Sequence, residues 1–169
     1  MEPEKTAASY DQLAAHWAGA DFNRANGIAQ HVRAMRFARK DGGLAIDVGC
    51  GSSGRIIEFL IEHGFSVEGV DISTEMLALA RERHPGVQFH QADVSVWEFP
   101  GKYDFISAWD SIWHVPLDRH EAVLEKLCAA LTPGGVMIFT TGAVDAPDEV
   151  TNPCLGQPLY HAALGIPHI

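Results

Sequence analysis

The chain has 169 residues, of which 47% are hydrophobic, and this length and composition predict one globular domain with a substantial core. Its 12 Lys and Arg residues are outnumbered by 22 Asp and Glu residues, so the formal net charge is −10. Because phosphate contacts need Lys and Arg, this charge argues against nucleic acid or an anionic membrane as the substrate. A small neutral or cationic substrate fits the charge better.

Targeting and metal-binding signals are missing from the sequence. No apolar run approaches the roughly 18–20 residues of a membrane span, and the first five residues lack the basic start and apolar core of a signal peptide. Cys50, Cys128 and Cys154 are an odd number without metal-type spacing, which is typical of cytosolic thiols. The histidines form no H-E-x-x-H motif. We therefore expect a cytoplasmic protein without a metal site.

Residues 1–43 are expected to form a helical N-terminal segment. Between residues 6 and 18 the apolar positions Tyr10, Leu13, Ala14 and Trp17 recur at helical spacing. This face either packs on the core or forms a lid over a ligand. A loop over 19–26 and a second helix from about 28 to 39 follow, the latter with Ile28, Val32 and Met35 turned inward.

Residues 44–142 are expected to form the α/β core. Strands are predicted over 44–48, 66–70, 87–91, 103–108 and 136–141, and helices over 54–63, 74–83 and 118–131. Strands that alternate with helices predict a doubly wound, mainly parallel sheet. Residues 143–169 are rich in Pro and Gly and are expected to be an irregular tail. Strand 136–141 would then be a long apolar edge, which favours pairing with a second copy in a homodimer.

A glycine-rich turn follows the first predicted strand. Gly49, Gly51 and Gly54 satisfy G-x-G-x-x-G, which is also the fingerprint of dinucleotide-binding proteins. Such glycines let a ligand approach bare backbone. Asp47 lies two residues before the first glycine, where a carboxylate would repel a pyrophosphate but attract an ammonium or a sulfonium.

Four acidic residues fall at or just after predicted strand ends: Asp47, Asp71, Asp93 and Asp110. In an open α/β sheet, ligands bind outside the carboxyl ends of the strands, and an acid at the second strand end can accept ribose hydroxyls. Each acid alone could equally be a turn former or a helix cap. Together they predict an electronegative bowl suited to a cationic ligand.

With these residues in place, the chain resembles the class I S-adenosylmethionine (SAM) dependent methyltransferases, which have a Rossmann-like fold. Residues 47–51 look like the first motif of that family and 70–73 like its second, and residues 91–94, 103–106 and 131–135 follow in order. The resemblance covers roughly residues 44–142. The family's sheet usually continues with an antiparallel hairpin, and we expect this chain to lack those final two strands.

The resemblance implies a set of residues that bind SAM. Gly49 and Gly51 would approach its amino-acid end, which Asp47 would orient, and Asp71 would accept from the ribose hydroxyls. The remaining implied contacts are Ile72 and Met76 beside the adenine, Asp93 and Val94 on its polar edge, Trp109 along the methionine portion, and Tyr10 and Trp17 of the lid near the sulfonium.

Methyl transfer from a sulfonium is an in-line displacement, for which the protein holds the acceptor about 3–3.5 Å from the methyl carbon. His114 is the leading candidate for a base because it follows the fourth strand, although a lone loop histidine is as often structural. Tyr160 and His161 are weaker candidates for substrate contact. An acceptor that is already nucleophilic would need no base.

Three functions are compatible with the sequence. The first is a methyltransferase that acts on a small-molecule acceptor and leaves S-adenosylhomocysteine (SAH). The second is a SAM-binding protein without catalysis. The third is an NAD-dependent oxidoreductase, which only the glycine triad supports and against which Asp47 counts. Calorimetric titration with SAM and with NAD separates the methyltransferase from the oxidoreductase. SAM binding without product formation from a panel of acceptors would favour the SAM-binding protein without catalysis.

Overall fold

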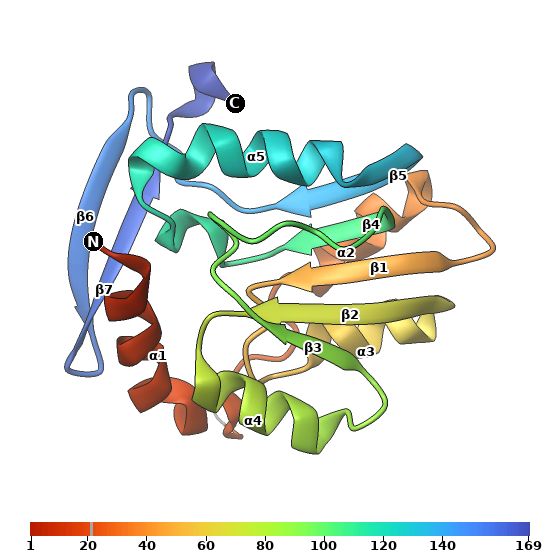
Figure 1. Ribbon diagram of the computed structural model, residues 1–169, viewed down its shortest axis with the longest axis horizontal. Coiled ribbons are helices and arrows are strands. Elements are labelled where there is room, and N and C mark those ends of the chain that lie inside the picture. Colours follow the sequence, from red (N-terminus) through yellow and green to blue (C-terminus); the bar gives the residue numbers. More distant parts are fainter. Residues whose placement is uncertain (21) are drawn as a thin grey trace.

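The computed structural model describes residues 1–20 and 22–169, so that Asp21, within the loop expected over 19–26, lies outside the described residues. Five parallel strands form one sheet in the order β3-β2-β1-β4-β5 (Figure 1). They are β1 (Gly43–Val48), β2 (Phe65–Asp71), β3 (Gln88–Gln91), β4 (Tyr103–Ala108) and β5 (Leu131–Phe139). The prediction of a doubly wound, mainly parallel sheet is confirmed.

Helices cover both faces of this sheet. They are α1 (Pro3–Ala18), α2 (Ile28–Ala34), α3 (Arg55–Glu62), α4 (Thr74–Arg83) and α5 (His120–Ala129), with short 3-10 helices at Met35–Phe37, Ile112–His114, Leu117–Arg119 and Ile166–His168. Because side chains alternate along a strand, Ala45 and Phe105 pack toward α3 while Ile46 and Ile106 pack toward α5. Among the described residues, none of the helices has the length and apolar run needed to cross a bilayer.

The carboxyl ends of the strands all lie at one edge of the sheet. Strand β1 is central, and Asp47 near its end pairs in register with Gly69 of β2 and Ser107 of β4. In Figure 1 the arrowheads of the strands point toward α1 and toward two further strands at the left of the view. This edge is where the sequence predicted a ligand site.

Those two further strands correct the prediction of an irregular tail. Strands β6 (Asp148–Cys154) and β7 (Gln157–Ala163) form an antiparallel hairpin as a separate two-stranded sheet. The main sheet still ends at β5, as expected. The hairpin escaped prediction because most of β6 is exposed and polar, and because its turn places Leu155 as well as Gly156 at positive φ, where Asn-Gly is the usual signal.

Helix α1 lies between α4 and the hairpin. On the hairpin side, the Ser9 hydroxyl donates a hydrogen bond to the carbonyl oxygen of Pro158 at 2.8 Å. On the other side, one Asp11 carboxylate oxygen accepts from the Ser73 hydroxyl at 2.6 Å and from the Glu75 N–H at 3.1 Å, at the start of α4. Because both sides of α1 are tied down, it spans the edge where the strands end.

Candidate active site

A cavity of about 600 Å³ lies at the carboxyl ends of the strands, between the glycine-rich turn, α1 and the hairpin. This volume falls in the usual range of small-molecule sites, roughly 300–1,000 Å³. Of the residues predicted to bind SAM or to act as a base, all except Asp47 line it: Tyr10, Trp17, Gly49, Gly51, Asp71, Ile72, Met76, Asp93, Val94, Trp109 and His114. The fold therefore brings residues from distant parts of the chain to one cavity, although the role of each stays a prediction.

Gly49 and Gly51 both form part of the cavity wall, but the space around a side chain differs between the two positions. Gly49 and Gly51 have φ of +68° and +57°, a region that L side chains rarely adopt. A Cβ at Gly49 would lie 2.2 Å from the Cβ of Ser111, whereas a Cβ at Gly51 would meet nothing closer than Met76 Sδ at 3.9 Å. Packing thus requires a glycine at 49, and Gly51 leaves bare backbone facing the cavity.

Asp71 at the end of β2 organises this turn. Its Oδ2 accepts from the Gly51 N–H at 2.8 Å and its Oδ1 accepts from the Ser73 N–H at 2.9 Å. Burial raises the pKa of Asp71, and these backbone N–H groups oppose the shift because they stabilise the carboxylate. Within the described residues Asp71 forms no ion pair.

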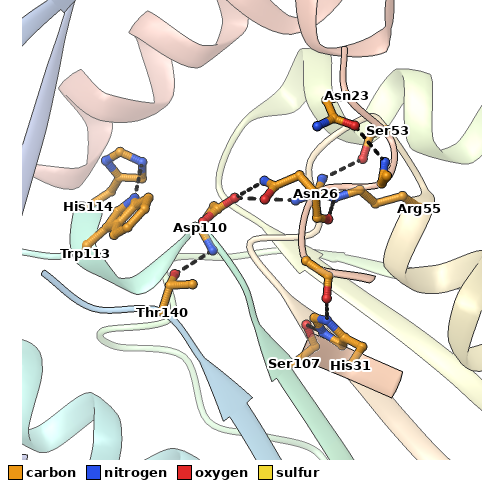
Figure 2. Close-up of polar contacts among 12 residues, drawn as sticks. Asn23, Asn26, His31, Ser53, Arg55, Ser107, Asp110, Trp113, His114 and Thr140 are labelled. Carbon is orange, nitrogen blue, oxygen red and sulfur yellow. Dashed lines mark hydrogen bonds and ion pairs between the residues drawn. The ribbon is translucent and has the colours of Figure 1, made fainter. Parts of the chain in front are cut away.

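The other acids on the cavity wall are partly neutralised by neighbours. Asp93 accepts from the Ser95 N–H and hydroxyl and lies 3.8 Å from Arg119. Asp110, at a positive φ of 53°, accepts from the Asn26 side chain at 2.6 Å and lies 3.6 Å from Arg55. Figure 2 shows Asn26 and Arg55 converging on Asp110. The bowl of carboxylates is therefore less negative than the sequence alone suggested.

Asp47 lies beneath the cavity wall and does not line it. Its side chain is 4% exposed, and burial raises its pKa to about 7, a shift that a hydrogen bond from Ser107 and the charge of Arg55 reduce. A direct contact between Asp47 and a ligand, as the sequence suggested, does not follow from this position. Asp47 is placed to act through its charge.

His114 is held by three hydrogen bonds. Its Nδ1 lies 2.6 Å from the carbonyl oxygen of Tyr160, which only accepts, so Nδ1 carries the proton. Its Nε2 therefore accepts, from the Trp113 N–H at 2.9 Å and from the Tyr10 hydroxyl at 2.6 Å (Figure 2 shows the Trp113 contact). The pKa of His114 is lowered to about 4, chiefly by burial and to a smaller extent by the nearby His161, while the hydrogen bond to the Tyr160 carbonyl opposes the shift. His114 is thus a neutral acceptor at pH 7.

Several cavity residues were missed by sequence reasoning. Asn152, Cys154 and Leu159 come from the hairpin, and Phe22 from the loop after α1, where the Arg55 guanidinium lies 4.9 Å above its ring. None of these positions carries a motif or a periodic pattern. Of the two weaker candidates, His161 lines the cavity, while the Tyr160 hydroxyl binds Glu149 and the Leu117 N–H and does not line it.

Some buried polar atoms on the described part of the cavity wall have no hydrogen-bond partner. In the part of the chain that the structure describes, Trp17 Nε1, Trp109 Nε1, Ser111 Oγ and His161 Nδ1 are buried without a hydrogen-bond partner, and all four residues line the cavity. Buried polar groups in proteins almost always have partners. The cavity therefore fits a ligand that brings polar atoms of its own.

Comparison with known proteins places the chain in a family. The family described as "Methyltransferase domain" matches residues 45–135. Trans-aconitate 2-methyltransferase of Paracidovorax citrulli is 39% identical over 112 residues, which cover 64% of this chain and 40% of that protein. Malonyl-acyl-carrier-protein O-methyltransferase of Enterobacter lignolyticus is 28% identical over 154 residues, which cover 89% of this chain and 58% of that protein. The chain thus spans about half the length of the curated relatives it matches.

Solved structures agree on the fold. A DhpI–SAH complex superposes with a TM-score of 0.70 at 24% identity, covering 98% of this chain and 82% of that one. SAM-bound CalS10, an amino pentose methyltransferase from Micromonospora echinaspora, superposes with a TM-score of 0.63 at 24% identity. The match covers 88% of this chain and 66% of that one. Because the family match covers more than half of the chain and the fold agrees with it, the chain belongs to the methyltransferase-domain family, in its class I, Rossmann-like form.

Proposed function

We propose that this chain is a SAM-dependent methyltransferase that acts on a small-molecule acceptor and leaves SAH. The observation that carries the proposal is the cavity at the strand ends, where bare backbone at Gly51 adjoins the Asp71 carboxylate and several aromatic side chains form part of the same wall. The relatives support it, since their names place methyl groups on trans-aconitate, on a malonyl group and on sugars.

The described contacts suggest how SAM would be held. Asp71 uses two of the about four lone-pair positions of a carboxylate on backbone N–H groups, which leaves acceptor capacity for the ribose hydroxyls. Ile72 and Met76 would flank the adenine, with Asp93 and Val94 at its polar edge. The unpartnered Nε1 group of Trp17 would donate to a ligand oxygen.

Bound SAM supplies an activated methyl group on a positively charged sulfur. The chain's own part is to hold the acceptor in line, exclude water and stabilise the charge. Tyr10, Trp17 and Trp109 line the cavity, and aromatic rings attract a cation that lies over their faces. The acceptor would lie toward the hairpin, where His161 Nδ1 has no partner among the described residues.

His114, the predicted base, would act through Tyr10. Since both nitrogens of His114 are engaged, the group left to meet the acceptor is the Tyr10 hydroxyl, whose proton His114 Nε2 accepts. Burial raises the pKa of Tyr10, so the hydroxyl stays neutral at pH 7 and serves to orient the acceptor. His114 is then a positioning residue.

His114→Ala should lower turnover while leaving the Kd for SAM unchanged. The loss should be about tenfold, smaller than the about 10²–10⁴-fold that general acid–base catalysis contributes, because the imidazole does not itself take the proton. Tyr10→Phe should lose a similar factor, and the double variant little more, since the two side chains act as one unit. His168→Ala, an exposed histidine near the chain end, is the matched control. Full activity of His114→Ala would remove the residue from the mechanism.

The proposal is tested by calorimetric titration of the purified chain with SAM, SAH and NAD, followed by mass spectrometry of products from a panel of acceptors. We expect SAM and SAH to bind and NAD not to bind. NAD binding in place of SAM would favour the oxidoreductase. SAM binding without a methylated product from any acceptor would favour the non-catalytic SAM-binding protein.

Two further expectations belong to this proposal. Strand β5 lies at the edge of the main sheet, and we propose that its apolar residues pair with a second copy, which sedimentation velocity would detect as a dimer. We also propose that the protein acts in the cytoplasm.

A further inference from the structure

The direction of the hydrogen bond from the Tyr10 hydroxyl is fixed by the ring that it contacts. His114 Nδ1 lies 2.6 Å from the carbonyl oxygen of Tyr160, and the Trp113 Nε1–H donates to His114 Nε2 at 2.9 Å (Figure 2 shows the Trp113 contact). A carbonyl oxygen only accepts and an indole N–H only donates, so both contacts assign the proton to Nδ1 and the lone pair to Nε2. The Tyr10 hydroxyl, 2.6 Å from the same Nε2, therefore donates its proton to His114.

Toward the cavity, the Tyr10 oxygen can then only accept a hydrogen bond. Its single proton is committed to His114, and within residues 1–20 and 22–169 this is the one hydrogen bond that the hydroxyl makes. Burial raises the pKa of Tyr10, and the charge of Asp71 adds to the shift, so the side chain stays an uncharged hydroxyl at pH 7. Since a hydroxyl oxygen has two lone pairs and Tyr10 lines the cavity, it suits a ligand group that carries a hydrogen.

Charged side chains line only the cofactor side of the described cavity wall. They are Arg55, Asp71, Asp93 and Asp110, whereas the lining residues from α1, the 3-10 helix at Ile112–His114 and the hairpin include no Asp, Glu, Lys or Arg. Arg55 is already engaged, because it lies 3.6 Å from Asp110 and its Nε donates to the carbonyl oxygen of Asn26 at 2.9 Å. An anionic methyl acceptor would thus find no free cation on the described wall, and burying an unpaired charge is costly.

The wall on the hairpin side is built largely from rings. The ring centroids of His114 and His161 lie 4.7 Å apart, that of Trp113 lies 5.9 Å from His161, and that of Tyr10 lies 5.2 Å from His114. The buried Leu159 of β7 lines the same part of the cavity. Because aromatic side chains pack well against other flat rings through offset and edge contacts, this wall suits a flat and largely apolar body.

We propose that the methyl acceptor is an uncharged hydroxyl group on a flat, largely apolar body, and that Tyr10, oriented by His114, selects it against a carboxylate. The inference rests on the proposed function. A hydroxyl donates to the Tyr10 oxygen, whereas a carboxylate would set its lone pairs against those of Tyr10. In the transfer, the hydroxyl oxygen bonds to the methyl carbon, the carbon–sulfur bond breaks with its electron pair on sulfur, and the hydroxyl proton passes to water. His114 is a positioning residue.

The experiment compares probes that share a flat body and differ in one group. They are 2-naphthol, 2-naphthoate and 2-methoxynaphthalene, with p-cresol and p-toluate as a smaller pair. Calorimetric titration of the SAH-loaded chain should show each hydroxyl probe binding at least about tenfold more tightly than its carboxylate partner, because the carboxylate leaves buried groups unpaired. With SAM in place of SAH, mass spectrometry should detect methyl ethers from the hydroxyl probes and no methyl esters from the carboxylates.

Two variants of the full chain test the role of Tyr10. Tyr10→Phe should weaken the binding of 2-naphthol by about 2- to 10-fold, the usual effect of one hydrogen bond, and leave 2-methoxynaphthalene unchanged because that ether cannot donate. His114→Phe frees the Tyr10 proton to point into the cavity, so the preference for 2-naphthol over 2-naphthoate should shrink, whereas a merely structural loss would weaken both probes alike. Tyr103→Phe is the matched control, since that hydroxyl donates to Glu68 at 3.0 Å and does not line the cavity.

The outcomes separate the two proposals. If a carboxylate probe binds as tightly as its hydroxyl partner or is methylated as fast, or if neither hydroxyl probe binds to the SAH-loaded chain, the inferred acceptor class is wrong while the proposed function stands. An unchanged preference in His114→Phe would contradict the role of Tyr10. If neither SAM nor SAH binds, the proposed function fails and the inference fails with it. Should His114→Phe not fold, Tyr10→Phe with its ether control decides the question.

Discussion

Asp71→Ala should weaken the binding of SAM by about 10- to 100-fold. Hydrogen bonds to a charged group contribute about 1.5–3 kcal/mol, and each 1.4 kcal/mol changes a dissociation constant tenfold. The ribose hydroxyls would lose their acceptor, and the N–H groups of Gly51 and Ser73 would lose theirs as well. The turn that cradles the ligand would therefore loosen along with the direct contact. Calorimetric titration with SAM and with SAH measures the loss.

Asp71→Asn separates these two contributions. Its amide oxygen still accepts from a backbone N–H, so the midpoint of thermal unfolding should stay closer to that of the parent chain than it does for Asp71→Ala. The affinity for SAM should still fall, because the uncharged amide accepts more weakly from the ribose. Asp41→Ala, an exposed residue in the turn before β1, is the control for removal of a carboxylate. An unchanged Kd in Asp71→Ala would contradict the ribose assignment.

Alanine at Gly49 and alanine at Gly51 should have different consequences. Both positions carry positive φ, which costs an L residue roughly 1–2 kcal/mol. Only at Gly49 does the new methyl also collide, at 2.2 Å from Ser111 Cβ, and overpacking of this kind costs about 1–3 kcal/mol more. Gly49→Ala should therefore lower the free energy of unfolding by about 2–5 kcal/mol, and Gly51→Ala by about 1–2 kcal/mol, as measured by urea denaturation.

For the affinity for SAM, we expect the larger effect at Gly51, although the larger loss of stability is expected at Gly49. Gly51→Ala places its methyl group on the cavity wall, where the bare backbone is expected to approach the ligand, so it should lose affinity for SAM despite its milder effect on stability. Gly86→Ala is the matched control, since that glycine is exposed and a Cβ there meets nothing within 4 Å. Equal stability of the Gly49 and Gly51 variants would show that Ser111 does not constrain the turn.

Local patterns were sufficient for the α/β core. The apolar strands, the helix breaks and the glycine-rich turn are all encoded by neighbouring residues, and so is the start of α4, where the Ser73 hydroxyl accepts from the Met76 N–H. The same logic failed on α2, where Val32 was expected inside. The structure leaves Val32 47% exposed and buries His31, because the polar ring finds its partners in Gly27 and Ser107.

In the candidate site, too, some features could be predicted from the sequence and others depend on the tertiary structure. The sequence by itself determined the strand-end acids and glycines of the cavity wall, because the parallel topology brings all carboxyl ends of the strands to one edge. Only the tertiary structure decided the rest: the hairpin that closes the cavity, the pairing of Asp110 with Arg55, the neutral state of His114, and the burial of Asp47 beneath the turn. Charge and protonation depend on which groups from distant segments lie within a few ångströms, and spacing along the chain does not encode those distances.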